Sequence, residues 1–372
     1  MLYFDNNATT PLLPEVKAAI TEMLDNFGNA SSVHQVGQAA RSRMDIARRQ
    51  VAELVGVRSE QVVFTGGGTE ANNMVLKSAA RDGRPIITQK TEHSCVMNSA
   101  KSIVEGNHPV VFLDVDSKGL ISLEGLESAL KMHPNALVSL MHANNETGVM
   151  QPLKGAYELC QKHGALLHSD AIQTGGKIPL SLDVADIVTL SFHKLGAPKG
   201  VGALVFKAGV ELEPLLHGGR QERGYRSGTE NTIGIVAAGV ACEKAKEHFG
   251  HYQELGEAKL KFEEKMKSLS DKVKIMGEGA ERLPVTSSIA LKGMSAEMMV
   301  MLMDMQGVCI SQGSACASGR VDPSHVIEAM GFPELALSTV RMASGWHNTP
   351  SDYDTLYETF EKVLKNTNFF DS

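Results

Sequence analysis

The sequence predicts an α/β protein in which a large domain, built on a mostly parallel sheet of seven strands, is joined to a smaller α+β domain. Its first two-thirds alternates short apolar runs with amphipathic segments of helical length, and this alternation stops near residue 250. The 372 residues also exceed the roughly 150 of a typical single domain. Alternating strands and helices are typical of a parallel sheet covered on both faces.

The apolar runs that predict the seven strands are 62–64, 86–88, 109–115, 136–141, 166–168, 186–192 and 203–206. Between several of them the spacing of apolar residues predicts helices over 70–80, 94–105 and 153–163. Ligands of such sheets bind where loops leave the carboxyl ends of the strands. Functional residues are therefore expected directly after these runs.

The chain after residue 250 predicts the smaller domain. A charged helix over 252–269 is followed by strands at 273–276 and 287–291, by a helix that Ser295 caps, and by a terminal helix capped at Thr349. The predicted boundaries are 15–250 for the large domain, and 1–14 together with 251–372 for the small one.

Composition excludes several classes of protein. With 42% hydrophobic and 21% charged residues, the chain is neither disordered nor fibrous. Its net charge of −7 argues against a basic nucleic-acid-binding surface. The apolar stretch 233–242 is far shorter than the roughly 20 residues of a membrane span, and no secretory signal is recognisable. Five cysteines without a C-x-x-C pair indicate a reducing compartment and no structural metal site, so the prediction is a cytoplasmic protein.

The first chemical signal is a glycine run that follows the strand at 62–64 and opens a helix. Gly66, Gly67 and Gly68 allow the backbone to approach a ligand closely, and free N–H groups of the first helical turn attract an anion. Thr69 adds a hydroxyl group there. Taken alone, the run is equally consistent with an ordinary strand–helix turn.

A second signal comes from the next strand ends. Asp170 directly follows one apolar strand, and Ser191, His193 and Lys194 end the next. An aspartate there often caps a helix, and a lysine is often solvated. Together, however, these residues fit pyridoxal phosphate, which needs an acid for its ring nitrogen, an amine for its aldehyde and a cradle for its phosphate. Asp170 and Lys194 would take the first two roles, while Thr69, Ser191 and His193 would face the phosphate.

Motifs along most of the chain resemble the cysteine desulfurases, in the long-loop class that feeds iron–sulfur cluster assembly. The match runs from 5–11 to Arg341 and includes 28–34, 91–93, 142–148, 226–231 and, most specifically, Gly313-Ser314-Ala315-Cys316. The resemblance implies a class V aminotransferase with the aspartate aminotransferase fold (fold type I of the pyridoxal phosphate enzymes). It also implies conversion of L-cysteine to L-alanine.

The resemblance implies a role for each matching residue. His93 is expected to stack on the cofactor ring and to take part in proton transfers, and Lys194 and His93 are both expected to be catalytic. Asn145 and Gln173 are expected near the phenolic oxygen of the cofactor. Asn145 should also lie near the substrate, whose carboxylate Arg341 would bind. Thr229 is expected to reach the phosphate of a neighbouring subunit, which implies a homodimer with a shared active site.

Cys316 carries the chemistry that distinguishes the family. It lies among small residues and glycines, in a loop expected over about 309–322, so the sequence predicts a mobile segment rather than a core position. The resemblance implies that Cys316 takes the sulfur as a persulfide and passes it to an acceptor protein such as an iron–sulfur scaffold. Cys316 could also ligate a cluster transiently.

Two other functions stay open on the sequence alone. A sibling enzyme of the same fold, such as a selenocysteine lyase or an aminotransferase, would be separated by its products. A non-catalytic scaffold that kept the fold would not bind pyridoxal phosphate. The chain also departs from the family pattern at Arg220, where a glycine is usual, and at Trp346, where an arginine is common. These departures leave substrate access and partner choice open.

Overall fold

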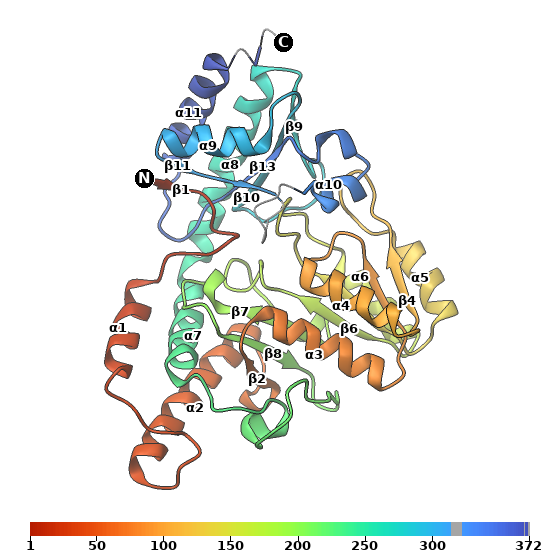
Figure 1. Ribbon diagram of the computed structural model, residues 1–372, viewed down its shortest axis with the longest axis vertical. Coiled ribbons are helices and arrows are strands. Elements are labelled where there is room, and N and C mark those ends of the chain that lie inside the picture. Colours follow the sequence, from red (N-terminus) through yellow and green to blue (C-terminus); the bar gives the residue numbers. More distant parts are fainter. Residues whose placement is uncertain (314–321, 368, 371–372) are drawn as a thin grey trace.

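The structure is a computed structural model that describes residues 1–313, 322–367 and 369–370. Figure 1 shows the small domain above the large one, with helix α8 (Phe249–Leu269) running along one side from one to the other. No helix in these residues is long and apolar enough to cross a membrane.

The large sheet has seven strands in the order β2-β8-β7-β6-β5-β3-β4. Its strands are β2 (Val62–Thr65), β3 (Ile86–Gln89), β4 (Val110–Leu113), β5 (Leu137–Met141), β6 (Leu166–Asp170), β7 (Ile187–Ser191) and β8 (Gly202–Phe206). Only β8 runs antiparallel to its neighbours, β2 and β7, among these strands. The prediction of a mostly parallel seven-stranded sheet in an α/β fold is confirmed.

Neighbouring side chains along a strand point to opposite faces of the sheet, so they pack into different hydrophobic clusters. In β2, Val62 and Phe64 pack in one cluster and Val63 in another; in β3, Ile86 and Ile87 divide in the same way. The helices of the large domain, which supply the rest of these cores, are α1 (Pro14–Met23), α2 (Gln35–Val55), α3 (Gly68–Arg81), α4 (Ser94–Glu105), α5 (Leu123–Met132), α6 (Leu153–Lys162) and α7 (Thr232–Ala245).

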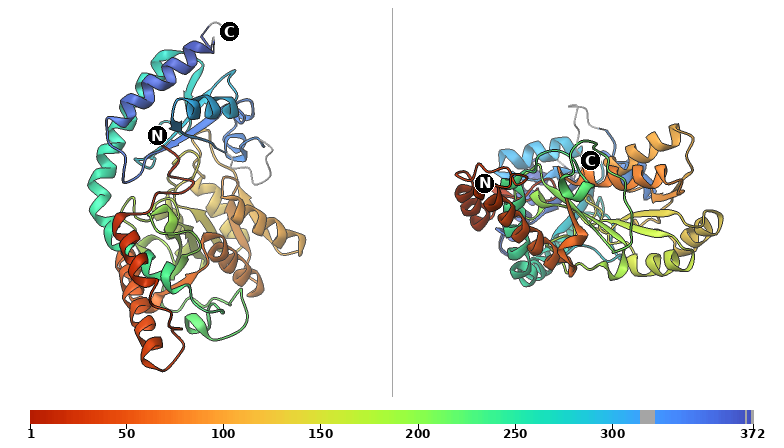
Figure 2. Two further views of the ribbon diagram at one scale, coloured as in Figure 1. Left: turned by 60° about the vertical axis from the view of Figure 1, so that its left-hand side comes forward. Right: turned by 90° about the horizontal axis from the view of Figure 1, so that it is seen from below.

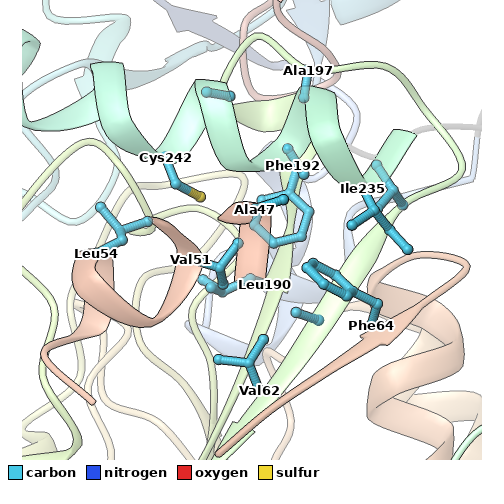
Figure 3. Close-up of a cluster of buried hydrophobic side chains, with 14 of the residues drawn as sticks. Ala47, Val51, Leu54, Val62, Phe64, Leu190, Phe192, Ala197, Ile235 and Cys242 are labelled. Atoms are coloured by element: carbon cyan, nitrogen blue, oxygen red, sulfur yellow. The ribbon is translucent and has the colours of Figure 1, made fainter. Parts of the chain in front are cut away.

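Figure 3 shows the cluster in which α2 and α7 meet the sheet: Ala47 and Val51 of α2 and Cys242 of α7 surround Phe192. The two helices can approach closely because Gly239 of α7 has no side chain. A Cβ atom at this position would lie 2.6 Å from the Cα atom of Ala47. α7 is apolar on nearly every side, which is typical of a fully buried helix. It was not predicted, because such a helix shows no apolar stripe.

The small domain is built on an antiparallel four-stranded sheet in the order β12-β13-β10-β9. Its strands are β9 (Val273–Ile275), β10 (Thr286–Leu291), β12 (Ser311–Gln312) and β13 (Thr339–Ala343), and β1 (Leu2–Tyr3) pairs with β11 (Val308–Cys309) beside it. Its helices are α8, α9 (Ala296–Met305), α10 (His325–Ala329) and α11 (Asp352–Asn366). Figure 2 shows α11 alongside α8, and both contribute to one core with Phe4.

Short 3-10 helices complete the chain: η1 (Ser59–Gln61), η2 (Leu182–Val184), η3 (Phe192–Lys194), η4 (Gln221–Gly224), η5 (Lys246–His248) and η6 (Pro333–Leu335). Ser295 caps α9 as predicted, but α11 begins at Asp352, after Thr349 and Pro350. Thr349 instead donates hydrogen bonds from its N–H and its hydroxyl to the Asp352 carboxylate, so this acid organises the start of the helix. The domain division at 14/15 and 250/251 stays a prediction; the second boundary falls in the first turn of α8.

Candidate active site

The loops at the carboxyl ends of the large sheet open into a cavity of about 940 Å³. The strands β2, β3, β5, β6 and β7 are mutually parallel, so their carboxyl ends share one edge. The small domain closes the other side. Ten residues predicted for the site line this cavity together: Gly68, Thr69, His93, Asn145, Asp170, Gln173, Ser191, His193, Lys194 and Arg341.

Asp170 ends β6 at the floor of the cavity and is only 4% exposed. One carboxylate oxygen, Oδ1, accepts a hydrogen bond from the backbone N–H of Ile172 at 3.0 Å. The other, Oδ2, accepts one from Nδ2 of Asn72 at 2.7 Å. Burial raises the pKa of Asp170, while these hydrogen bonds and the neighbouring His93 lower it. The group is therefore a buried acid held in one orientation.

Lys194 ends η3, directly after β7, and its amine lies in the cavity. Nζ donates hydrogen bonds to the backbone carbonyls of Asn7 and, at 2.6 Å, Ala8. Burial first, and the positive charge of Arg341 second, lower the pKa of Lys194 to about 8. The amine is thus much closer to its neutral, nucleophilic form at physiological pH than a solvated lysine is.

His93 is the N-cap residue of α4. Its Nδ1 accepts a hydrogen bond from the backbone N–H of Cys95 at 3.2 Å, so the start of the helix fixes the plane of the ring. Burial, the charge of Lys194 and His325 lower the pKa of His93, although Asp170 raises it. His93 is therefore oriented by the helix while its ring remains on the cavity wall.

The start of α3 lies at the cavity, where the glycine run predicts an anion-binding corner. Gly67 has φ of +148°, a conformation that favours glycine, and Gly68 begins the helix. A side chain at Gly68 would come within 2.2 Å of Ile172. Thr69 of the first turn is exposed to the cavity. Free N–H groups at a helix N-terminus attract negative charge.

His193 completes that corner from the end of β7. Its Nδ1 lies 3.2 Å from the hydroxyl of Thr9, and burial together with Lys194 lowers the pKa of His193 to about 4. The ring is therefore neutral at physiological pH and carries one N–H donor. Ser191, the last residue of β7 and two residues before His193, is buried.

Gln173 is held from two sides by residues that sequence reasoning missed. Its Nε2 donates to the Asn7 carbonyl at 3.1 Å, and its Oε1 accepts from Nζ of Lys177 at 3.2 Å. Lys177 also donates to Oδ1 of Asn7 at 3.0 Å. Burial and Lys194 lower the pKa of Lys177 to about 7. Lys177 follows Gln173 by four residues, a helical spacing that offered a signal for the pair.

Arg341 reaches the cavity from β13 of the small domain and is only 3% exposed. Nη2 pairs with Oδ1 of Asp5 at 2.7 Å, and Nη1 donates to the carbonyl of Asn145 at 3.2 Å. Nε is buried without a partner among the described residues. A carboxylate ligand would therefore have to share the guanidinium with Asp5, which the sequence did not identify as part of the site.

One predicted residue among those that the structure describes, Thr229, does not line this cavity. Thr229 lines a separate small cavity with Gly66 and Arg226. Cys316 lies outside the described residues, whereas Ser311, before it in the chain, lines the main cavity. The two departures from the family pattern also lie elsewhere: Trp346 donates from Nε1 to the Pro11 carbonyl at 3.0 Å, and Arg220 lines a third, polar cavity.

Comparisons with known proteins agree on one family. The model of the class V aminotransferases matches residues 2–356. Cysteine desulfurase 2 of Trichormus variabilis is 39% identical, over 98% of this chain and 93% of its own, and a cysteine desulfurase of Cereibacter sphaeroides is 40% identical over 98% and 95%.

Solved structures agree as well. A NifS-like protein from Rickettsia africae superposes with a TM-score of 0.90 at 31% identity, covering 98% of this chain and 99% of its own. A structure described as SspA in complex with cysteine gives a TM-score of 0.81 at 31% identity, covering 92% and 98%.

Proposed function

This chain belongs to the class V aminotransferase family, among its cysteine desulfurases, and we infer from the cavity how its own residues perform that reaction. Enzymes of this family generally use pyridoxal phosphate. We propose that this chain converts L-cysteine to L-alanine with that cofactor and transfers the sulfur, through a persulfide on Cys316, to an acceptor protein. The observation that carries the proposal is the convergence of Lys194, Asp170, His93 and Arg341 on one cavity.

The residues around the cavity fit the parts of pyridoxal phosphate. A buried acid, Asp170, suits the ring nitrogen, and the amine of Lys194 suits the aldehyde. The start of α3 with Thr69, and the neutral ring of His193, suit the phosphate. When bound, the cofactor supplies an aldehyde that holds the amino group of the substrate and a ring that accepts electrons.

In this proposal each side chain performs a step suited to its chemistry. Arg341 binds the substrate carboxylate with its two-pronged guanidinium, beside Asn145. Lys194, whose pKa is lowered to about 8, would take the Cα proton of the substrate. Asp170 would hold the proton on the ring nitrogen of the cofactor, and His93 would carry protons in the same cavity.

The sulfur step belongs to Cys316, whose assignment rests on the sequence motif. A thiolate is a soft nucleophile and attacks the sulfur of the substrate, forming an S–S bond as the C–S bond breaks. The electron pair of the broken bond remains on the carbon fragment, which is protonated and leaves as alanine. A second thiol, on an acceptor protein such as an iron–sulfur scaffold, then takes the sulfur from Cys316; transient ligation of a cluster by Cys316 is part of the same proposal.

A homodimer is part of the proposal, because Thr229 does not face the cavity of its own chain. The segment between α1 and α2 exposes Leu24, Phe27 and Val33, at 66%, 87% and 89%. Apolar side chains exposed together in one segment favour an interface with another copy of the chain. In that arrangement Thr229 would serve the neighbouring site.

The test is mass spectrometry of the purified protein after incubation with L-cysteine, together with measurement of alanine. The proposal predicts one extra sulfur on the peptide that contains Cys316, and alanine release in the presence of a reductant. Cys316→Ala should lose the extra sulfur and most alanine release, whereas Cys309→Ala, outside the cavity, should behave as the unmodified chain. Full turnover by Cys316→Ala would contradict the assigned role. The same assay run with selenocysteine, and a search for a keto-acid product, separates the sibling enzymes.

A further inference from the structure

Cys95 places a thiol on the wall of the cavity, and the proposed reaction does not use it. It is the second residue of α4 and lies on the cavity wall with His93 and Asp170. Its Sγ lies 3.1 Å from Nδ1 of His93 and 3.3 Å from Nδ2 of Asn72. The thiol therefore stands between two groups that surround the proposed cofactor position.

The hydrogen-bond partners of Asn72 determine which way the thiol hydrogen points. Asn72 is fully buried, and its Nδ2 donates to Oδ2 of Asp170 at 2.7 Å. The reverse orientation would place the amide oxygen against a carboxylate oxygen, so the NH₂ group must face Asp170. The second N–H of that group then points to Sγ of Cys95. Because the sulfur accepts this bond, its own hydrogen is free to donate to Nδ1 of His93.

Nδ1 of His93 receives a second donor from the same residue. The backbone N–H of Cys95 points at it from 3.2 Å, because His93 is the N-cap of α4. A ring nitrogen that accepts from two donors cannot carry the proton of a neutral imidazole. The proton must then be on Nε2.

We propose that Cys95 is a positioning residue: its backbone amide and its thiol together hold His93 in the tautomer protonated at Nε2. This leaves Nε2 as the ring nitrogen that exchanges protons with a bound substrate. The inference deepens the proposed function and rests on it for the role of His93. It also gives the site a continuous chain of hydrogen bonds from Asp170 through Asn72 and Cys95 to His93.

The charges around the pair support this arrangement. Burial, and then the charge of Asp170, raise the pKa of Cys95 to about 12, and Glu92 acts in the same direction. The group is therefore a thiol that can donate, and a poor nucleophile beside the substrate. Burial, Lys194 and His325 favour the neutral form of His93, against the opposing charge of Asp170.

The test is nitrogen NMR of the full-length, cofactor-loaded protein labelled with ¹⁵N in histidine. The His93 signals are identified by their loss in His93→Gln. The proposal predicts a protonated Nε2 and an unprotonated Nδ1 in the unmodified chain and in Cys95→Ser, which retains a hydroxyl donor. In Cys95→Ala the backbone amide still donates to Nδ1, so the Nε2 tautomer should persist, but loss of the thiol donor should raise the protonation midpoint of His93 by about half a pH unit. Cys309→Ala is the control and should match the unmodified chain.

Two results would overturn the proposal. A proton on Nδ1 in the unmodified chain would do so without any variant, even if the substitutions impaired folding. An unchanged protonation midpoint in Cys95→Ala would show that the thiol does not act on the ring. The tautomer is measured without turnover, so the two proposals can fail separately. A chain that released no alanine, but carried the His93 proton on Nε2, would contradict the proposed function and leave the role of Cys95 intact. If the enzyme is active, the apparent pKa on the acidic side of the kcat–pH profile should rise in Cys95→Ala together with the protonation midpoint of His93, and KM should stay unchanged.

Discussion

Lys194 is the residue whose protonation should set the pH at which the chain takes up pyridoxal phosphate. Only the neutral amine attacks an aldehyde, and the pKa of Lys194 is lowered to about 8 by burial and by Arg341. Below that pH the amine is protonated, so uptake by cofactor-free protein should slow about tenfold per pH unit. Above it, the rate should become constant. Stopped-flow absorbance of the bound cofactor measures this profile.

Arg341 provides a matched variant for the same profile. Replacing it by glutamine removes a positive charge that lowers the pKa of Lys194, so the midpoint of uptake should move upward. A rate that keeps rising beyond pH 10 in the unmodified chain, as for a solvated lysine of pKa about 10.4, would contradict this account of Lys194.

Arg341 is also expected to determine the affinity for the substrate carboxylate. A charged hydrogen bond contributes about 1.5–3 kcal/mol, so Arg341→Ala should raise KM for L-cysteine by about 10- to 100-fold. Arg341→Lys keeps the positive charge but lacks the two-pronged geometry of a guanidinium. Its KM should therefore lie between those of the unmodified chain and Arg341→Ala. Steady-state assays of alanine release measure the change. Equal KM values in all three proteins would show that the carboxylate binds elsewhere.

Among the elements of the fold, α2 and η4 are joined by a buried ion pair. Nη1 and Nη2 of Arg48 donate to the two carboxylate oxygens of Glu222 at 2.6 and 2.7 Å, and the N–H of Phe64 donates to the same carboxylate. Removing one partner leaves the other charge buried and unpaired. Glu222→Gln should therefore lower the free energy of unfolding by about 3–5 kcal/mol, measured by urea denaturation.

An exposed ion pair in the same domain is the control for this prediction. Arg43 and Glu22 join α2 to α1 at the surface, where solvent screens the charges. Glu22→Gln should change the unfolding free energy by less than about 1 kcal/mol. Equal effects of the two substitutions would mean that burial does not determine the strength of the Arg48–Glu222 pair.

The elements that the sequence predicted are those with a clear period or a clear boundary. The helix over 94–105 matches α4, and the predicted strands of the large sheet all coincide with observed ones. α7 was missed because its alanine- and glycine-rich sequence is apolar around the whole helix. Much of the candidate site followed from strand ends. Lys177 did not, because its burial depends on Asn7, which is 170 residues away along the chain.

Cys95 shows the same limit at one position. The spacing of Cys95, two residues after the N-cap His93, is enough to suggest that the two residues are in contact. The contact of Cys95 with Asn72, however, depends on how α3 packs against α4. Sequence spacing alone therefore does not indicate this contact.

At the scale of the whole molecule, the proposed dimer predicts the mass in solution. The chain should scatter light as a particle of twice its 40.0 kDa. Replacing Leu24, Phe27 and Val33 together by serine removes the exposed apolar surface and should give the mass of one chain. Leu260→Ser, which changes an exposed leucine on α8, should leave the dimer intact. A monomeric unmodified chain would contradict the shared site.

The most direct test of the central claim is reduction of the cofactor-loaded protein with borohydride, followed by peptide mass spectrometry. Reduction makes the bond between the cofactor and the chain permanent, so it records which amine holds the aldehyde. The account predicts a single pyridoxyl label on Lys194, and no label in Lys194→Ala. A label on Lys177 or Lys199 of the unmodified chain, or none at all, would contradict it.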